Sequence, residues 1–348
     1  MAAGLGKKFG PYEIIERIGV GAMGEVYRAK QPMLNREIAI KVLHDDVAKD
    51  KSLLERFQRE GKAVAKLEHP NIVAGIDVGQ VDGRFYFAME VLEGKALDAV
   101  LEGILKMSEV QALEIVKQVA LALGFAHSKG YLHRDVKPEN IMLTNTGVVK
   151  LMDLGLARPM NVDPGMALTQ EGQAVGTPDY MSPEQAQGFK DLTSATDLYS
   201  LGAVLYRMIT GKLPFDGDNY AIVMLNHIQQ PVPDPRVENP EVTEPTASLC
   251  MRMLAKKVED RPASGEAIAE EIEQILFLHQ SRADAQQKPD VPAVPASEDA
   301  ADKAKRPNRP GTGAVNRLSR VTSSESDAAA APVSTTSTGR IPRRWFNK

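Results

Sequence analysis

One stretch, residues 131–143, constrains the fold more than any other, because it sets charged and amide side chains between two apolar runs. Hydrophobic anchors on both sides favour a short polar loop. The loop contains a carboxylate, a cation and a carboxamide at Asp135, Lys137 and Asn140. Phosphoryl transfer to a hydroxyl requires these kinds of group, with the carboxylate as base and the amide oxygen as a Mg²⁺ ligand. The same composition is ordinary in turns, so the stretch alone is equally compatible with a solvated turn between two strands.

Composition places the chain among ordinary globular proteins. Its 348 residues are 43% hydrophobic and 25% charged, which is enough to bury a sizeable core and allows about two domains. The single cysteine, Cys250, excludes an intramolecular disulfide and a Cys-rich metal site, and it fits a reducing compartment. No apolar run of signal-peptide type follows the first residues, and none approaches the ~18 residues of a membrane span. We therefore expect no transmembrane segment and a cytoplasmic location.

The net charge of −4 hides an asymmetry between two parts of the chain. From Lys303 onward there are ten cations and two carboxylates, so this part carries +8 and the remainder about −12. An acidic folded part argues against nucleic-acid binding. Residues 281–348 are rich in Ala, Pro, Ser and Thr, and we expect them to be disordered because they offer too little apolar surface to offset chain entropy. This basic tail is interpreted as a solubilising linker, a docking arm for acidic partners or a contact with anionic membranes.

Hydrophobic periodicity predicts an α+β fold in which strands come first and helices follow. The expected strands cover residues 12–19, 25–29, 37–43 and 85–91. The expected helices cover residues 52–67, a long segment that begins at Ser108, and about 195–210. A sheet-rich part with one helix is therefore joined to a larger helical part near residues 90–94.

Three glycines, at positions 19, 21 and 24, lie between the first two expected strands. Glycine lets the backbone turn tightly and bring its amide groups close to phosphate oxygens. A dinucleotide-binding fingerprint needs a helix after the glycines, whereas residues 25–29 are typical of a strand. No Gly-Lys-Ser/Thr ends a glycine loop, which excludes a phosphate loop of the Walker type. The pattern that remains is a glycine flap over a nucleotide.

Three further charged groups lie where they can meet phosphates or a metal. Lys41 closes an apolar run and is either a solvated lysine at a strand end or a phosphate ligand. Glu60 lies close to the apolar face of the next expected helix, so it needs a partner, and a Lys41–Glu60 ion pair meets that need. Asp153 follows the expected strand 148–151 and is either a turn residue or, with Asn140, a source of oxygen ligands for Mg²⁺.

Taken in order, these segments resemble the eukaryotic-type (Hanks-type) protein kinase family, and especially its bacterial serine/threonine members. The matching segments are Gly19-x-Gly21-x-x-Gly24-x-Val26, Ala39-x-Lys41, Glu60, His133-Arg134-Asp135-x-Lys137-x-x-Asn140, Asp153-Leu-Gly155 and Ser182-Pro183-Glu184. The resemblance covers about residues 10–275 and implies a bilobal fold. The expected kinase domain is residues 9–280, with an N-lobe of about 9–90, a hinge of about 90–95 and a C-lobe of about 96–280.

The resemblance also implies roles at the reaction centre. Asp135 is expected to be the catalytic base and Lys137 to contact the γ-phosphate. Lys41, oriented by Glu60, is expected to hold the α- and β-phosphates. The expected Mg²⁺ ligands are Asn140 and Asp153.

The nucleotide is expected to lie between the glycine flap, the N-lobe sheet and the hinge. The expected ATP-contacting residues are Gly19, Val20, Gly21, Ala22, Met23, Gly24, Val26, Ala39, Lys41, Glu90, Leu92 and Met142. Among them, Val26, Ala39 and Met142 would sandwich the adenine, while Glu90 and Leu92 would offer backbone hydrogen bonds from the hinge.

The resemblance implies regulation by a phosphorylated activation loop. Thr169 is the candidate phosphosite, and Arg134, Arg56 and Arg158 are the candidate guanidinium groups of a phosphate-binding pocket.

Two structural contacts are also implied in the helical part. Asp197 is expected to brace the catalytic loop, and Glu184 to pair with Arg261 as a clamp that serves stability rather than chemistry.

The implied function is a serine/threonine protein kinase that transfers the γ-phosphoryl group of ATP to protein substrates, with Mg²⁺, and autophosphorylates its activation loop. A pseudokinase that binds partners through the same fold is the main alternative, disfavoured because every reaction-centre residue is present. A small-molecule kinase is disfavoured by residues 176–185, which in protein kinases form the floor for a substrate peptide. The sequence assigns no physiological substrate, activating signal or oligomeric state.

Overall fold

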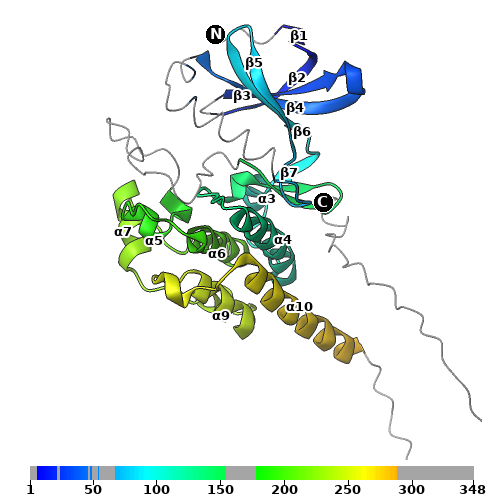
Figure 1. Ribbon diagram of the computed structural model, residues 1–348. Coiled ribbons are helices and arrows are strands. Elements are labelled where there is room, and N and C mark those ends of the chain that lie inside the picture. The colour runs from blue at the N-terminus through cyan, green and yellow to red at the C-terminus, as the bar shows by residue number, and fades with distance from the viewer. Residues whose placement is uncertain are drawn as a thin grey trace, which may run out of the picture. The chain divides into compact units, whose positions relative to one another are not determined.

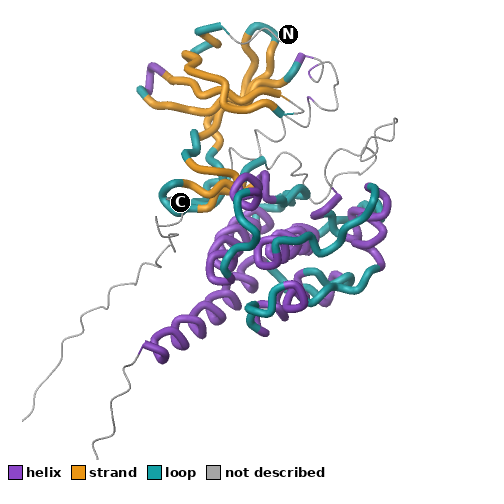
Figure 2. Tube along the Cα trace, turned by 180° about the vertical axis from the view of Figure 1, so that it is seen from behind, coloured by secondary structure: helices purple, strands orange, loops and turns teal. Residues whose placement is uncertain are grey.

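The computed structural model describes residues 6–21, 24–45, 48, 54, 67–153 and 178–287, and the statements below concern these residues. Those up to Arg282 belong to one compact unit. Its strands form a six-stranded and a three-stranded sheet, and its helices group beside the smaller sheet (Figure 2).

The larger sheet makes up the N-lobe, and every neighbouring pair of its strands is antiparallel (Figure 1). Its strands are β1 (Lys8–Phe9), β2 (Tyr12–Val20), β3 (Gly24–Gln31), β4 (Arg36–Leu43), β5 (Gly75–Val81) and β6 (Arg84–Glu90), in the order β1-β2-β3-β4-β6-β5. The register of β2 against β3 shifts twice, between Ile14 and Glu16 and between Arg17 and Gly19. Such irregularities increase local twist, so the strand curls as it approaches the glycine segment.

The N-lobe core follows from β-branched and aromatic residues on the central strands. Ile38 and Ile40 on β4 are completely buried and pack in one cluster with Tyr12 and Tyr86. Both tyrosine hydroxyls donate to Asp77 Oδ2 at 2.7 Å, so the polar ends of the aromatic rings are satisfied inside the sheet's own framework.

A smaller sheet lies at the junction of the lobes, with β7 (Gly94–Ala96), β8 (Ile141–Thr144) and β9 (Val149–Leu151) in that order. Residues 71–73 run beside β9: Leu151 N donates to Asn71 O at 2.8 Å, and Val73 N donates to Leu151 O at 3.0 Å. The Asn71 side chain donates to Gln118 Oε1 and to Val149 O, both at 2.9 Å. The segment that leads into β5 is therefore anchored on C-lobe elements.

The C-lobe is built on two central helices that pack against each other, α4 and α6 (Figure 1). The C-lobe helices are α3 (Leu97–Glu102), α4 (Glu109–Ser128), α5 (Pro183–Ala186), α6 (Ser194–Thr210), α7 (Tyr220–Gln229), α8 (Pro235–Glu238), α9 (Glu244–Met253) and α10 (Gly265–Gln287). All residues of α6 except Ser194 and Arg207 are buried. The helix ends at Gly211, whose φ of 78° is the left-handed conformation that glycine adopts without strain.

The structure confirms the predicted α+β architecture, with a sheet-rich part followed by a helical part, and the strands expected near residues 12–19, 25–29, 37–43 and 85–91. Ser108 caps α4 as predicted, by accepting from Gln111 N. The helix predicted over residues 52–67 lies almost wholly outside the described residues, and so does most of the basic tail. The domain boundary near residue 280 stays a prediction. Within the described part of the chain, every helix is too short or too polar to cross a membrane.

Candidate active site

The loop at residues 131–143 is organised by one buried carboxylate from α6. Asp197 is completely buried, and its Oδ2 accepts from His133 N at 2.8 Å while its Oδ1 accepts from Arg134 N at 2.7 Å. The predicted brace is therefore confirmed. Two backbone donors held in this way stabilise the left-handed conformation of Arg134, whose φ is 66°.

Asp197 remains ionised because its environment offsets its burial. Burial alone would raise the pKa of this carboxyl group, but His127 Nε2, 2.7 Å away, and the backbone donors bring the pKa below its usual value. The sequence reasoning did not include His127. Its position in the last turn of α4, as an ionisable residue beside buried alanines, was the available signal.

Two polar side chains of the loop, those of Lys137 and Asn140, both contact Asp135. Lys137 Nζ lies 2.9 Å from Asp135 Oδ2. Asn140 Nδ2 donates to Asp135 O at 2.8 Å and to Asp135 Oδ2 at 3.1 Å. Because the amide nitrogen is engaged with Asp135, the orientation of Asn140 is fixed and its Oδ1 is the atom suited to a hard cation.

Asp153 is brought to this loop by the residue before it. Met152 N donates to Asn140 O at 2.8 Å, and His133 Nε2 lies 2.9 Å from Met152 O. The chain then turns at Asp153, whose φ is 49°. Amide and carboxylate oxygens from two adjacent segments suit Mg²⁺, whose remaining ligands are usually phosphates and water. The described residues contain no cluster of three or more His, Cys, Asp or Glu that could hold a metal ion.

Lys41 crosses from the N-lobe to this site. Its Nζ lies 2.8 Å from Asp153 Oδ1. Packing around Asp153 opposes ionisation, yet the nearby ammonium group keeps the pKa of the carboxyl below its usual value. The predicted partner of Lys41, Glu60, lies outside the described residues. The sequence reasoning did not anticipate the contact between Lys41 and Asp153.

The glycine segment connects β2 and β3 directly, so a strand follows the glycines as predicted. Gly21 N donates to Gly24 O at 2.9 Å, which closes the turn. A Cβ on Gly24 would lie 2.2 Å from Val42 O, so glycine is needed there because β3 and β4 approach closely. Ala22 and Met23 lie outside the described residues.

The residues predicted to contact the nucleotide here lie on β2, β3, β4, β6 and β8 and just after β6. Val26 pairs with Lys41 between β3 and β4, and Ala96 pairs with Met142 between β7 and β8. Ala39 is buried on β4. The remaining predicted residues, Val20 at the end of β2, Glu90 at the end of β6 and Leu92 just after it, occupy the flap and the hinge. Their roles stay predictions.

Comparison with known proteins places this geometry in a family. The sequence model described as protein kinase domain matches residues 12–275. The chain belongs to the protein kinase family. Serine/threonine-protein kinase pkn3 from Myxococcus xanthus is 39% identical over 272 residues, which cover 76% of this chain and 50% of pkn3. Serine/threonine-protein kinase PknB from Mycolicibacterium smegmatis is 38% identical over 286 residues, or 81% of this chain and 44% of PknB. The chain thus spans half or less of the length of these relatives.

A solved kinase domain supports the same assignment. The PknI kinase domain of Mycobacterium tuberculosis superposes with a TM-score of 0.62 at 29% identity, covering 79% of this chain and 99% of that domain. The resemblance inferred from the sequence motifs, to bacterial serine/threonine kinases, is therefore confirmed.

The kinase domain also contains the predicted structural clamp. Arg261 Nη1 lies 2.8 Å from Glu184 Oε1, and Arg261 Nη2 donates to Glu184 Oε2 at 2.9 Å. Thr196 donates to Glu184 Oε1 as well, at 2.8 Å. Burial would raise the pKa of Glu184, but Arg261 lowers it below its usual value. The clamp ties α5 to the loop after α9.

The predicted regulatory residues fall mostly outside the described chain. Thr169, Arg56 and Arg158 are among the residues not described. Arg134 is described, and its carbonyl accepts from Gln185 Nε2 at 2.9 Å. Its proposed role in binding a phosphorylated loop stays a prediction.

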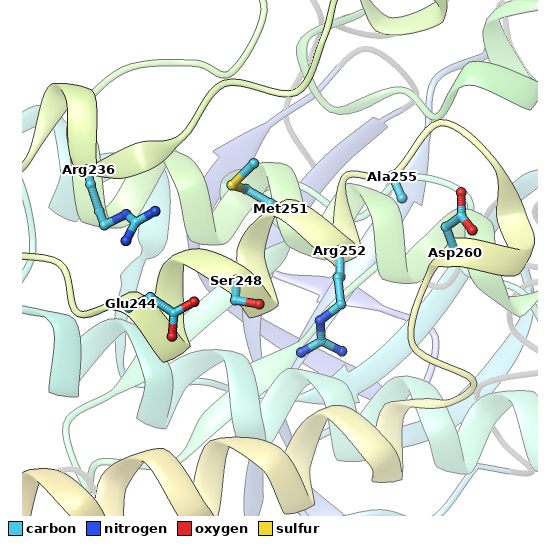
Figure 3. A pocket seen from close by; sticks show the side chains of 7 residues that line it. All are labelled: Arg236, Glu244, Ser248, Met251, Arg252, Ala255 and Asp260. Carbon is cyan, nitrogen blue, oxygen red and sulfur yellow. The ribbon is translucent and has the colours of Figure 1, made fainter.

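A hollow on α8 and α9 contains none of the residues of the candidate active site (Figure 3). Two arginines in its lining already have acidic partners: Arg236 lies 2.7 Å from Asp234, and Arg252 pairs with Glu271. We assign the hollow no ligand, because its cations are already neutralised.

Proposed function

We propose that this kinase domain is catalytically active and transfers the γ-phosphoryl group of ATP to Ser and Thr hydroxyls of proteins. One observation carries the proposal: a buried carboxylate, Asp197, holds the loop in which Lys137 and Asn140 both contact Asp135. Fixed positions matter because phosphoryl transfer depends on orientation and charge stabilisation.

The proposed reaction begins with a Ser or Thr hydroxyl hydrogen-bonded to Asp135. The hydroxyl oxygen attacks the γ-phosphorus and its proton passes to the Asp135 carboxylate. The new O–P bond forms as the bond to the β–γ bridging oxygen breaks, and ADP leaves. Lys137, 2.9 Å from Asp135, places its ammonium group beside the migrating phosphoryl group. Lys41 holds the α- and β-phosphates.

We propose Asn140 and Asp153 as the residues that hold Mg²⁺. When bound, the ion would neutralise charge on the phosphate oxygens. The protein's part is to fix the two ligands: Asn140 by its bonds to Asp135, and Asp153 by the bond from Met152 N to Asn140 O.

Substrates, autophosphorylation and location are proposed on the same basis. We propose protein substrates with Ser or Thr acceptors, as the names of the relatives indicate for those proteins. We also propose autophosphorylation at Thr169. A cytoplasmic location is proposed because the single cysteine, Cys250, is a buried free thiol. No observation favours the pseudokinase alternative.

The test is incorporation of ³²P from labelled ATP into a generic protein substrate, followed by phosphoamino acid analysis. Asp135→Asn should lower kcat by about 10²- to 10⁴-fold, the usual contribution of a general base, without changing the melting temperature. Asp82→Asn, in the exposed β5–β6 turn where φ is 49° and Asn is tolerated, is the matched control and should keep full activity. Equal incorporation by wild type and Asp135→Asn would overturn the proposal, as would label confined to tyrosine.

A further inference from the structure

The hinge carries an ion pair that the sequence reasoning did not anticipate. Lys150 Nζ on β9 lies 2.6 Å from Glu90 Oε1 at the end of β6. The same carboxylate oxygen accepts from Ala74 N at 2.8 Å. Lys150 Nζ also donates to Ile72 O at 3.2 Å. We call the Glu90–Lys150 pair, together with its bonds to Ile72 and Ala74, the hinge latch.

The latch is well shielded from water. The Lys150 side chain is 15% exposed and the Glu90 side chain 31%. Val149 and Leu151, on either side of Lys150, are completely buried. An ammonium group in such a strand needs acceptors in place of water, and the latch supplies a carboxylate and a carbonyl.

The latch fixes the peptide groups proposed to meet adenine. Glu90 N donates to Ala74 O at 3.0 Å, and Glu90 is in register with Ile38 of β4. With its side chain held by Lys150 as well, Glu90 is restrained from three directions. Lys150 is itself in register with Met142 of β8, the residue proposed to lie under the adenine. The latch therefore connects two sides of the adenine pocket.

The same strand leads from the latch to the metal site. After Lys150, Leu151 is bonded to residues 71 and 73, and Met152 N donates to Asn140 O. Asp153 is the next residue. Each step of this short segment is hydrogen-bonded, so the position of Lys150 and the position of Asp153 are coupled through a backbone with little freedom.

We propose that Lys150 is a positioning residue: by holding the Glu90 carboxylate it sets the hinge for adenine and ties adenine binding to β9, which leads into Asp153. This inference rests on the proposed function, because it assigns adenine to the hinge. Without the ammonium group, the Glu90 carboxylate turns to water and the bond from Ala74 N weakens. Nucleotide binding then has to order the hinge, which lowers affinity without altering the chemistry at Asp135.

The decisive measurement is binding of adenosine, which lacks phosphates, by titration calorimetry with the full chain. Lys150→Met should weaken adenosine binding by about fivefold, the effect of one charge-assisted hydrogen bond. KM for ATP should rise by about the same factor, while kcat stays within about twofold of wild type. Lys150→Arg, which keeps a cation at the latch, should restore most of the affinity. In Glu90→Ala, adding Lys150→Met should cause no further loss.

Lys117→Met is the matched control. Lys117 is 19% exposed and lies 2.8 Å from Glu273, on α4 and α10. The variant loses an ion pair between α4 and α10 that has no bond to the latch, so adenosine affinity and KM should stay at wild-type values. If Lys150→Met binds adenosine as tightly as Lys117→Met does, or if kcat falls while KM is unchanged, the latch is merely structural and the inference fails.

The two proposals fail in different ways. A wild-type chain that transfers no phosphate, but whose adenosine affinity still depends on Lys150, would overturn the proposed function and support the latch. An active wild type with a Lys150→Met variant of unchanged affinity would overturn the latch alone.

Discussion

Two ion pairs of the same length differ in how far they are exposed to water. Lys41–Asp153 and Arg261–Glu184 each have a shortest N–O distance of 2.8 Å. The first pair is 16% and 47% exposed, and the second is 0% and 8% exposed. Arg261 also donates to Ala195 O at 2.9 Å, so it has no room to exchange partners.

The difference in exposure separates a pair whose partners must exchange during the proposed reaction from a pair that must stay intact. A buried ion pair is costly to break, because the partner left behind has no water to solvate it. A half-exposed pair is weak and can be replaced by other charges. In the proposed reaction, Lys41 exchanges Asp153 for the phosphates of ATP, and the Asp153 carboxylate would then be available to hold Mg²⁺ together with Asn140. The Glu184–Arg261 clamp and Asp197, whose carboxylates are buried, are the contacts that stay unchanged. We call them the fixed floor.

Breaking the buried pair should have the largest effect on stability. Arg261→Met leaves the Glu184 carboxylate buried without its cation, and we expect the free energy of unfolding to fall by about 3–5 kcal/mol in denaturant titrations. Arg252→Met is the control in the same lobe: Arg252 is 43% exposed beside Glu271, so its loss should cost under about 1 kcal/mol. Similar costs for the two variants would contradict the assignment of the clamp to the fixed floor.

The second largest effect on stability is expected at a buried histidine of the C-lobe, and it depends on pH. His227 is completely buried on α7, its Nδ1 lies 2.9 Å from Tyr199 Oη, and Lys256 Nζ donates to its carbonyl. Burial, reinforced by Lys256, lowers its pKa from 6.5 to about 4. The unfolded chain therefore binds a proton that the fold excludes between these values. Stability from this residue is complete above pH 6.5 and declines as the pH falls toward 4, by about 3 kcal/mol in total.

The test is the difference between wild type and His227→Gln in unfolding free energy, measured from pH 7 to pH 4.5. Carboxylates titrate in both proteins, so they cancel in the difference. The advantage of wild type over the variant should shrink as the pH falls. Parallel pH profiles would show that His227 is protonated in the folded state as readily as in the unfolded state.

The sequence predicted the buried contacts of the fixed floor, but it did not predict the lysine contacts near the proposed nucleotide site. Asp197 and the Glu184–Arg261 pair were predictable because each recurs at a fixed place in the family's motifs, and both are confirmed. The bend at Asp153 followed from a carboxylate and a glycine after a short apolar strand. Lys150 was not recognised, although it interrupts an apolar strand just as Lys41 does. Its partner, Glu90, is sixty residues away in sequence, and no local pattern reveals such a contact.

The burial of His227 and the need for glycine at position 24 were missed for the same reason. His227 lies on a helix whose partners, Tyr199 and Phe215, come from other elements. Gly24 was interpreted as a phosphate-binding glycine, while the structure gives it a packing reason, the approach of Val42 O. Both depend on which elements meet in space, and periodicity within one element carries no information about that.

The smallest effect on stability is expected at the Lys41–Asp153 pair. There the contrast between stability and activity should be the largest. Lys41→Met removes a cation that lies beside a half-exposed carboxylate, so the free energy of unfolding should change by under about 1 kcal/mol. Activity should nevertheless fall by about a hundredfold, because a positioned charge at the phosphates is lost. Lys117→Met, a lysine of similar exposure outside the cleft, should change neither activity nor nucleotide affinity. Denaturant titration and the ³²P assay on the same preparations measure both quantities. A large loss of stability in Lys41→Met would place this lysine in the fixed part of the molecule, and the division between an exchangeable pair and a buried clamp would not hold.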